Sequence, residues 1–134
     1  VDYVEYVDMD TLLAKCDIVS VHVPQNKDTI GMIGPDEIAK MKPGSILINT
    51  ARGPVVDSEA LAEALKSGHI AGAGIDVFEK EPPISEDHPL LNAPNVVATP
   101  HVAFATKEAF AKRAVIVVDN IAKYIAGEPQ NVIC

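Results

Sequence analysis

The sequence contains no tryptophan, two cysteines and only six aromatic residues in all, three tyrosines and three phenylalanines. Proteins that bind single-stranded nucleic acid stack bases on exposed aromatic side chains, so this composition argues against such a surface. Basic residues are also scarce, since 11 Lys and Arg against 19 Asp and Glu give a net charge of −8. Phosphate-rich partners attract basic surfaces. We therefore expect neither a nucleic acid nor a membrane as a partner.

Long apolar runs are lacking too. No stretch approaches the roughly 20 residues that a membrane-spanning helix needs, and residues 1–5 lack the basic and apolar regions of a signal peptide. We therefore expect a cytoplasmic protein. Cys16 and Cys134 show no metal-ligand spacing. The sequence predicts no metal site and two free thiols, because the cytosol keeps thiols reduced.

Hydrophobic residues make up 48% of the 134 residues, which is enough to build a core for one domain. Four short apolar runs rich in β-branched residues are continuous rather than alternating, as is typical of parallel strands covered on both faces. These runs cover residues 18–23, 45–49, 71–77 and 95–99. Residues 3–7 are a candidate for one further short strand.

Helical patterns lie between most of these runs. A short helix is expected over residues 10–15, and Pro35 opens another that ends near Pro43. Asp57 or Ser58 caps a third helix, which ends at Gly68. Apolar residues then recur at helical spacing from about residue 106 to 127. The predicted class is α/β, with a partial Rossmann-like, doubly wound parallel sheet over residues 1–104 and a long C-terminal helix within residues 105–134.

Three residues that could carry chemistry follow predicted strands, where open α/β sheets build their sites. Arg52 offers a fixed fork of donors that matches a carboxylate, and Gly53 after it allows a tight turn. Glu81 and His101 could form an acid/base pair in which the carboxylate orients the ring and favours its protonated form. Each residue alone could equally be an ordinary surface or loop residue. Together they predict a site for a small carboxylic acid.

The segments that hold these residues resemble the D-isomer-specific 2-hydroxyacid dehydrogenases. The resemblance rests on residues 49–57, 74–82 and 95–101, which occur in the family's order and separation. It implies that Arg52 binds the substrate carboxylate and carbonyl, that His101 is the general acid/base and that Glu81 supports His101. Glu79 could also claim the last role, but in the family pattern the supporting carboxylate directly precedes a proline, as Glu81 does.

The resemblance also implies a cofactor, NAD, with NADP as an alternative, and a small 2-hydroxy or 2-oxo acid as the substrate. A hydride would pass between NAD and the substrate carbon. The family's cofactor pocket corresponds here to residues after each strand. These residues are Val23, Pro24, Thr29, Thr50, Ala51, Arg52, Asp76 and His101.

A dinucleotide fold should also hold a Gly-rich turn and an acidic residue for the ribose, and neither is found here. We therefore expect this chain to be the C-terminal part of a longer enzyme, inactive alone and weak in NAD binding. Residues 18–23 would then form an exposed edge strand, which predicts a homodimer that hides it. The alternative is a non-enzymatic half-Rossmann binding or scaffold module, corepressor-like or used for oligomerisation.

The other histidines carry less weight. His22 falls in a strand pattern and is expected to be buried, either packed in the core or facing the adenine side of a cofactor. His69 and His88 are expected to be ordinary surface residues.

Overall fold

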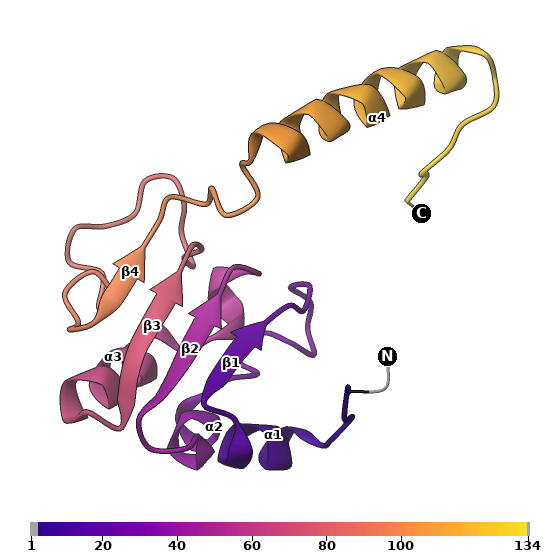
Figure 1. Cartoon of the computed structure of the whole chain (residues 1–134). Helices are drawn as coiled ribbons and strands as arrows, with labels where there is room; N and C mark the ends of the chain where they lie inside the picture. The colour runs from indigo at the N-terminus through magenta and orange to yellow at the C-terminus, as the bar shows by residue number, and fades with distance from the viewer. Residues whose placement is uncertain (1–2, 134) are drawn as a thin grey trace. The chain divides into compact units, whose positions relative to one another are not determined.

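The computed structural model describes residues 3–133 and divides the chain into two units, one ending at His101 and one starting at Val102 (Figure 1). The first unit holds a parallel sheet with three α-helices, and the second holds one long α-helix. The parallel, Rossmann-like α/β class predicted from the sequence is confirmed. The domain boundary expected at residue 104 stays a prediction.

The sheet of the first unit contains four parallel strands in the order β1-β2-β3-β4. The strands are β1 (Ile18–Val21), β2 (Ser45–Asn49), β3 (Ile70–Ile75) and β4 (Val96–Ala98). Their last residues are register partners across the whole sheet, Val21 with Asn49, Asn49 with Ile75, and Ile75 with Ala98. The loops after all four strands therefore begin at one level, along one edge of the sheet.

The helices of this unit begin and end where the capping residues predict. They are α1 (Met9–Lys15), α2 (Pro35–Lys40) and α3 (Ser58–Ser67), with a short 3₁₀ helix at Gly53–Val55. Asp57 caps α3 by accepting a hydrogen bond from the Ala60 backbone N–H, and Gly68 ends it at φ +77°, a left-handed conformation that suits glycine. The sequence-based bounds differ from these by up to three residues, the largest difference being at the end of α2.

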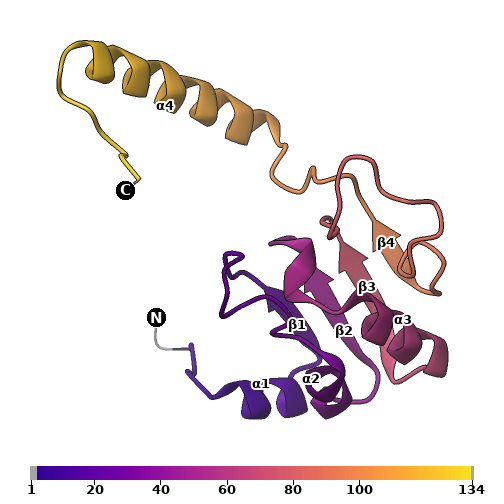
Figure 2. The same ribbon diagram turned by 180° about the vertical axis from the view of Figure 1, so that it is seen from behind.

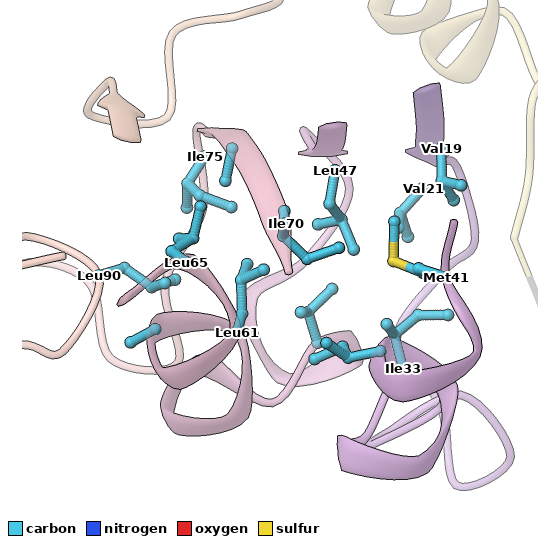
Figure 3. Packing of buried hydrophobic residues seen from close by; sticks show 14 of the residues in the cluster. Val19, Val21, Ile33, Met41, Leu47, Leu61, Leu65, Ile70, Ile75 and Leu90 are labelled. Carbon is cyan, nitrogen blue, oxygen red and sulfur yellow. The ribbon is translucent and has the colours of Figure 1, made fainter. Parts of the chain in front are cut away.

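The α-helices α1, α2 and α3 lie on one face of the sheet (Figures 1 and 2). Side chains from the strands and helices interlock in a single core, whose fully buried members include Leu13, Met41, Leu47, Leu61 and Ile70 (Figure 3). Burying a side chain of this size contributes about 1.5–3 kcal/mol. The helix-covered face of the sheet therefore holds the first unit together.

The other face of the sheet is exposed in the first unit. Burial alternates along β1, and Ile18, Ile46 and Val97 expose 57%, 38% and 70% of their surface. The continuous apolar runs predicted a sheet covered on both faces. In the first unit, α1, α2 and α3 all cover the same face. β1 lies at the edge of the sheet, as expected.

The N-terminal segment corrects one expectation. Residues 3–7 form no strand, and Tyr3 and Tyr6 are almost fully exposed. No strand in the described sheet pairs with this segment, because β1 pairs with β2 and the order ends there. Cys16 is a half-buried free thiol, and Cys134 lies outside the described residues.

The second unit contains α4 (Lys107–Ile125), which matches the predicted extent of the long amphipathic helix. The Thr106 hydroxyl caps it by accepting a hydrogen bond from the Ala109 backbone N–H. No residue of α4 is buried, and Val118, Ile121 and Ile125 expose more than half of their surface. Between residues 3 and 133, no helix has the length and apolar character needed to cross a membrane.

Candidate active site

The loop after β2 is shaped by a buried asparagine at the strand end. Asn49 is only 1% exposed, and its side-chain oxygen accepts a hydrogen bond from the Ala51 backbone N–H at 3.0 Å. Its amide nitrogen donates to the Arg52 carbonyl, also at 3.0 Å. These two bonds replace backbone pairing just after the strand and set the course of the chain into Arg52. The sequence analysis missed this role, although an amide at the end of an apolar run was a signal for it.

Gly53 lets the loop after β2 press against the loop after β3. A Cβ atom on Gly53 would lie 2.1 Å from the Phe78 carbonyl carbon and 2.5 Å from the Glu79 nitrogen. The backbone of Gly53 is outside the left-handed region, so glycine is needed here for close approach and not for the tight turn that the sequence suggested. The contact sets the distance between the segments that carry Arg52 and Glu81.

Asp76 connects three strand ends. Its carboxylate, in a residue only 3% exposed, accepts a hydrogen bond from the Thr99 hydroxyl at 2.5 Å. Its backbone N–H donates to Asn49, and its carbonyl accepts from the His101 backbone N–H at 2.8 Å. A buried carboxylate is costly unless hydrogen bonds satisfy it, and this one is held at the carboxyl edge of the sheet. Asp76 therefore fixes where the segment bearing His101 leaves β4.

Glu81 and His101 meet at this edge. Oε1 of Glu81 lies 2.6 Å from Nδ1 of His101, and Oε2 accepts a hydrogen bond from the Phe78 backbone N–H at 3.3 Å. An ionised carboxylate only accepts hydrogen bonds, so Nδ1 carries the proton and donates. The side chains of Glu81 and His101 are 22% and 42% exposed. The Glu81 carboxylate thus determines the tautomer of the His101 ring, with the proton on Nδ1.

His101 also adopts an unusual backbone conformation, with φ at +55°. Left-handed backbone is uncommon for residues other than glycine and is found most often at sites where surrounding contacts impose it. Here the backbone N–H of His101 bonds the Asp76 carbonyl while its ring bonds Glu81. Both contacts hold the residue in this conformation.

Arg52 lies at the same edge but points its guanidinium elsewhere. The side chain is exposed, and Nη1 donates to the carbonyl of Ala51 at 2.6 Å. Arg52, like Glu81 and His101, therefore lies in a loop that follows the carboxyl end of a strand. Of the three side chains, the described contacts join Glu81 with His101. An exposed guanidinium with a weak neutral partner can turn to an incoming carboxylate at small cost.

The residues expected around a cofactor lie along this edge in different environments. Pro24 and Thr50 are exposed, and Val23 and Ala51 are half-buried. Thr29 is 7% exposed, and its hydroxyl donates to the Pro24 carbonyl at 2.6 Å while accepting from the Asn26 backbone N–H. Thr29 therefore shapes the loop after β1 from inside.

Two histidine expectations were wrong. His22 is exposed, and its Nε2 lies 2.8 Å from the Ser20 hydroxyl on the open face of edge strand β1, so it is not packed in the core, while a contact on the adenine side of a cofactor stays a prediction. His88 is not an ordinary surface residue, since its side chain is 13% exposed and its Nε2 lies 2.9 Å from Oε2 of Glu79. His69 is half-buried, with Nε2 3.0 Å from the Ile38 carbonyl.

Glu79 is the carboxylate that does not reach His101. Its Oε1 accepts a hydrogen bond from the Ser58 hydroxyl at 2.5 Å, and its other oxygen faces His88. Burial alone would raise the pKa of Glu79, but the hydrogen bonds from Ser58 and His88 outweigh burial and hold this pKa below its ordinary value of 4.5. The geometry thus separates the two candidate carboxylates and pairs Glu81 with His101.

An open pocket of about 440 Å³ adjoins Ser58, Glu79 and His88, and neither Arg52, Glu81 nor His101 lines it. Within residues 3–133, no group of three or more His, Cys, Asp or Glu side chains is placed to hold a metal ion. The chemistry available at the carboxyl edge is therefore that of a guanidinium and a carboxylate–imidazole pair. Such a set can bind a small acid and exchange one proton with it.

Comparison with known proteins identifies the class to which this fold and site belong. Residues 1–103 match the family described as D-isomer specific 2-hydroxyacid dehydrogenase, NAD binding domain. The match covers most of the chain and includes every candidate site residue. The chain belongs to this family.

Individual relatives agree. The chain is 51% identical to a D-3-phosphoglycerate dehydrogenase of Archaeoglobus fulgidus over 126 residues, which are 94% of this chain and 24% of the relative. It is 52% identical to a glyoxylate reductase of Thermofilum pendens over 124 residues, 92% of this chain and 36% of that protein. The chain therefore spans about a quarter to a third of the length of these curated relatives.

A solved structure shares the arrangement of elements. The D-isomer specific 2-hydroxyacid dehydrogenase of Lactobacillus delbrueckii ssp. bulgaricus, in its NAD-complexed form, superposes with a TM-score of 0.87 at 36% identity. The superposition covers 98% of this chain and 44% of that one.

Proposed function

We propose that this chain forms part of an NAD-dependent oxidoreductase that interconverts small D-2-hydroxy acids and 2-oxo acids. The observation that carries the proposal is the 2.6 Å contact between Glu81 and His101 at the carboxyl edge of a parallel sheet. The names of the relatives, a phosphoglycerate dehydrogenase and a glyoxylate reductase, point to the same substrate class.

The proposed reaction divides between a proton and a hydride. In the oxidative direction Nε2 of His101 accepts the hydroxyl proton of the substrate, and Glu81 stabilises the resulting imidazolium through Nδ1. Arg52 holds the substrate carboxylate with its paired donors, which fixes the hydroxyl carbon in front of His101. Bound NAD would supply the acceptor for the hydride that leaves that carbon. In the reductive direction the same proton returns from Nε2 to the carbonyl oxygen.

The residues on this edge fit the nicotinamide end of a dinucleotide. The buried Asp76 carboxylate can accept a hydrogen bond from a carboxamide, and the exposed Pro24 and Thr50 offer contact surface at the level of the strand ends. The other residues that would contact the cofactor are Val23, Ala51 and Arg52. Thr29 would act indirectly, because its buried hydroxyl bonds the Pro24 carbonyl and holds the loop after β1. Within this set the Asp76 carboxylate accepts hydrogen bonds, which suits the amide N–H groups of a carboxamide.

The test is activity of the natural polypeptide that carries these residues, with NADH and either glyoxylate or hydroxypyruvate. His101→Gln removes the acid/base group and should lower kcat about 100-fold or more, the usual contribution of such a group. Arg52→Gln should act mainly on KM, because it removes carboxylate binding. His69→Gln is the matched control, since Nε2 of His69 lies 3.0 Å from the Ile38 carbonyl and His69 has no part in the proposed site.

Full activity of the His101→Gln variant would contradict the proposed proton transfer. Absence of reduction with every 2-oxo acid, together with retained binding of a protein partner, would instead favour the scaffold alternative. Arg52→Ala separates these two, because a scaffold has no need for a carboxylate-binding guanidinium.

We also propose that the chain self-associates through β1. This strand ends the sheet and exposes Ile18, so its outer edge can pair with another strand. Light scattering over a concentration series should show a dimer, and Ile18→Lys, which places a charge on the edge, should shift the equilibrium toward monomer. A wild-type chain that stays monomeric at high concentration would contradict the proposal. A cytoplasmic location stays a prediction.

A further inference from the structure

A second carboxylate–imidazole pair lies in the same loop as Glu81 and has no part in the proposed proton transfer. Both oxygens of Glu79 have partners, the Ser58 hydroxyl at 2.5 Å and Nε2 of His88 at 2.9 Å. The His88 side chain is 13% exposed, whereas that of His101 is 42% exposed. The second pair is therefore the more enclosed of the two.

The hydrogen bonds of His88 determine which ring nitrogen carries its proton. The Leu90 backbone N–H donates to Nδ1 of His88 at 3.3 Å, so Nδ1 must offer a lone pair. The proton of the neutral ring then lies on Nε2, which donates to Glu79. Each ring nitrogen is satisfied by the protein itself. His88 in this state acts as a structural clamp, a term used here for its two bonds: Nε2 donates to Glu79, and Nδ1 accepts from the Leu90 backbone.

This clamp holds the turn that carries Glu81. The His88 ring packs edge-on against Phe78, with ring centroids 5.0 Å apart and planes at 89°, and its Nε2 holds the next residue, Glu79. The backbone N–H of Phe78 donates to Oε2 of Glu81, the carboxylate that binds His101. His88 therefore contacts both Phe78 and Glu79, and the backbone of Phe78 in turn binds the Glu81 carboxylate.

We propose that His88, acting with Ser58 through Glu79, is a positioning residue that holds Glu81 against His101. The inference rests on the proposed function, since it assigns Glu81 and His101 to proton transfer. Without the clamp, the Phe78–Glu79 backbone gains freedom, the Glu81 carboxylate spends less time on His101, and the proton-transfer step slows. We expect substrate binding by Arg52 to change less, because its guanidinium bonds the Ala51 carbonyl in the loop after β2 and not the Phe78–Glu79 backbone.

Two variants of His88 separate its hydrogen bond from its packing. His88→Phe keeps an aromatic ring beside Phe78 and removes the bond to Glu79. His88→Gln places an amide nitrogen near the position of Nε2 and can still donate to Glu79. His69→Phe is the matched control, because it removes a comparable imidazole bond, to the Ile38 carbonyl at 3.0 Å, away from the loop that carries Glu81.

The first readout does not depend on activity. The Phe78 amide bonds Oε2 of Glu81, so its hydrogen-exchange rate by NMR reports how firmly Glu81 is held. Loss of a hydrogen bond to a charged group should raise this rate on the order of tenfold in His88→Phe. His88→Gln should restore most of the protection, and His69→Phe should leave it unchanged.

The second readout is steady-state kinetics of the natural polypeptide. His88→Phe should lower kcat on the order of tenfold and change KM by less than about twofold, because it disturbs a group that acts in the transition state. His88→Gln should recover kcat. A general loss of folding would not produce this division between kcat and KM, nor rescue by glutamine.

Unchanged Phe78 exchange in His88→Phe would overturn the inference, and so would an equal change in His69→Phe. The proposed function fails by a different result, namely wild-type kcat in Glu81→Gln. In that case the exchange data still decide whether His88 positions Glu81.

Discussion

Gly53→Ala tests the contact that sets the spacing of the site. The added Cβ would lie 2.1 Å from the Phe78 carbonyl carbon and 2.3 Å from its oxygen. Ordinary contact begins at 3.4 Å, so the two backbone segments must separate by about 3.4 − 2.1 = 1.3 Å. The obstacle is backbone, which cannot move aside by a change of rotamer. The strain must therefore pass into the segments on both sides.

The cost follows from what that separation disturbs. Val55 and Phe78 are 0% and 4% exposed, so the shift acts on a packed core, where overpacking costs about 1–3 kcal/mol. Moving Glu79 also weakens its bond to Ser58, which adds about 1 kcal/mol. We expect a loss of about 2–4 kcal/mol in the free energy of unfolding. A displacement of 1 Å at Glu81 should also lower activity about 100-fold.

Urea unfolding followed by circular dichroism measures the stability change. Gly74→Ala is the matched control, because a Cβ there meets only the Ile48 side chain, at 3.8 Å, and the backbone is not left-handed. Alanine at such a position should be neutral or stabilise by about 0.4–1 kcal/mol, since it restricts the unfolded chain. A Gly53→Ala variant within about 0.5 kcal/mol of the wild type would refute the reasoning, because that range is typical of surface substitutions.

Two further predictions concern Glu79 and the start of α3. The pKa of Glu79 is below its ordinary value of 4.5, so its ionised form stabilises the fold above that pH and this contribution is lost as the pH falls through the lowered pKa. Unfolding midpoints measured while the pH is lowered below 4.5 should therefore fall less steeply in Glu79→Gln than in the wild type, whereas Glu86→Gln, an exposed change in the same loop, should match the wild type. Asp57→Ala removes the side-chain cap of α3 and should cost about 1 kcal/mol in urea unfolding, with Asp57→Asn keeping most of it. Equal stabilities of these two variants would contradict the capping role.

The sequence predicted most of the first unit because its signals are local. The run of β-branched residues in β2 and the cap pair of Asp57 and Gly68 each depend on a few neighbouring residues, and the structure follows them closely. The same signals could not show that the helices of the first unit cover one face of the sheet only. An apolar strand has the same sequence whether a second layer covers it or not, and Ile18 and Val97 show this.

The contact between Glu81 and His101 was predictable from the sequence, whereas most other contacts around it were not. The family pattern that the sequence resembles favoured Glu81 over Glu79, because Glu81 directly precedes a proline, and the structure pairs it with His101. The role of Gly53 could not be predicted, because the atoms that require a glycine belong to a segment 25 residues further along the chain. Long-range close approach leaves no periodic pattern in a sequence. For the same reason His88 was taken for a surface residue.

The two histidines of the loop edge show why residue type alone does not identify a catalytic group. His101 gives Nδ1 to a carboxylate and stands 42% exposed, whereas His88 gives Nε2 to a carboxylate and accepts a backbone bond at Nδ1 while 13% exposed. In the first arrangement a carboxylate lies at Nδ1, and in the second a carboxylate lies at Nε2 and a backbone N–H at Nδ1. Each glutamate thus determines what its histidine can do. The two glutamates have the same side chain, and they differ in role only because the backbone places them differently, with the close approach of Gly53 to Phe78 and Glu79 fixing that part of the loop.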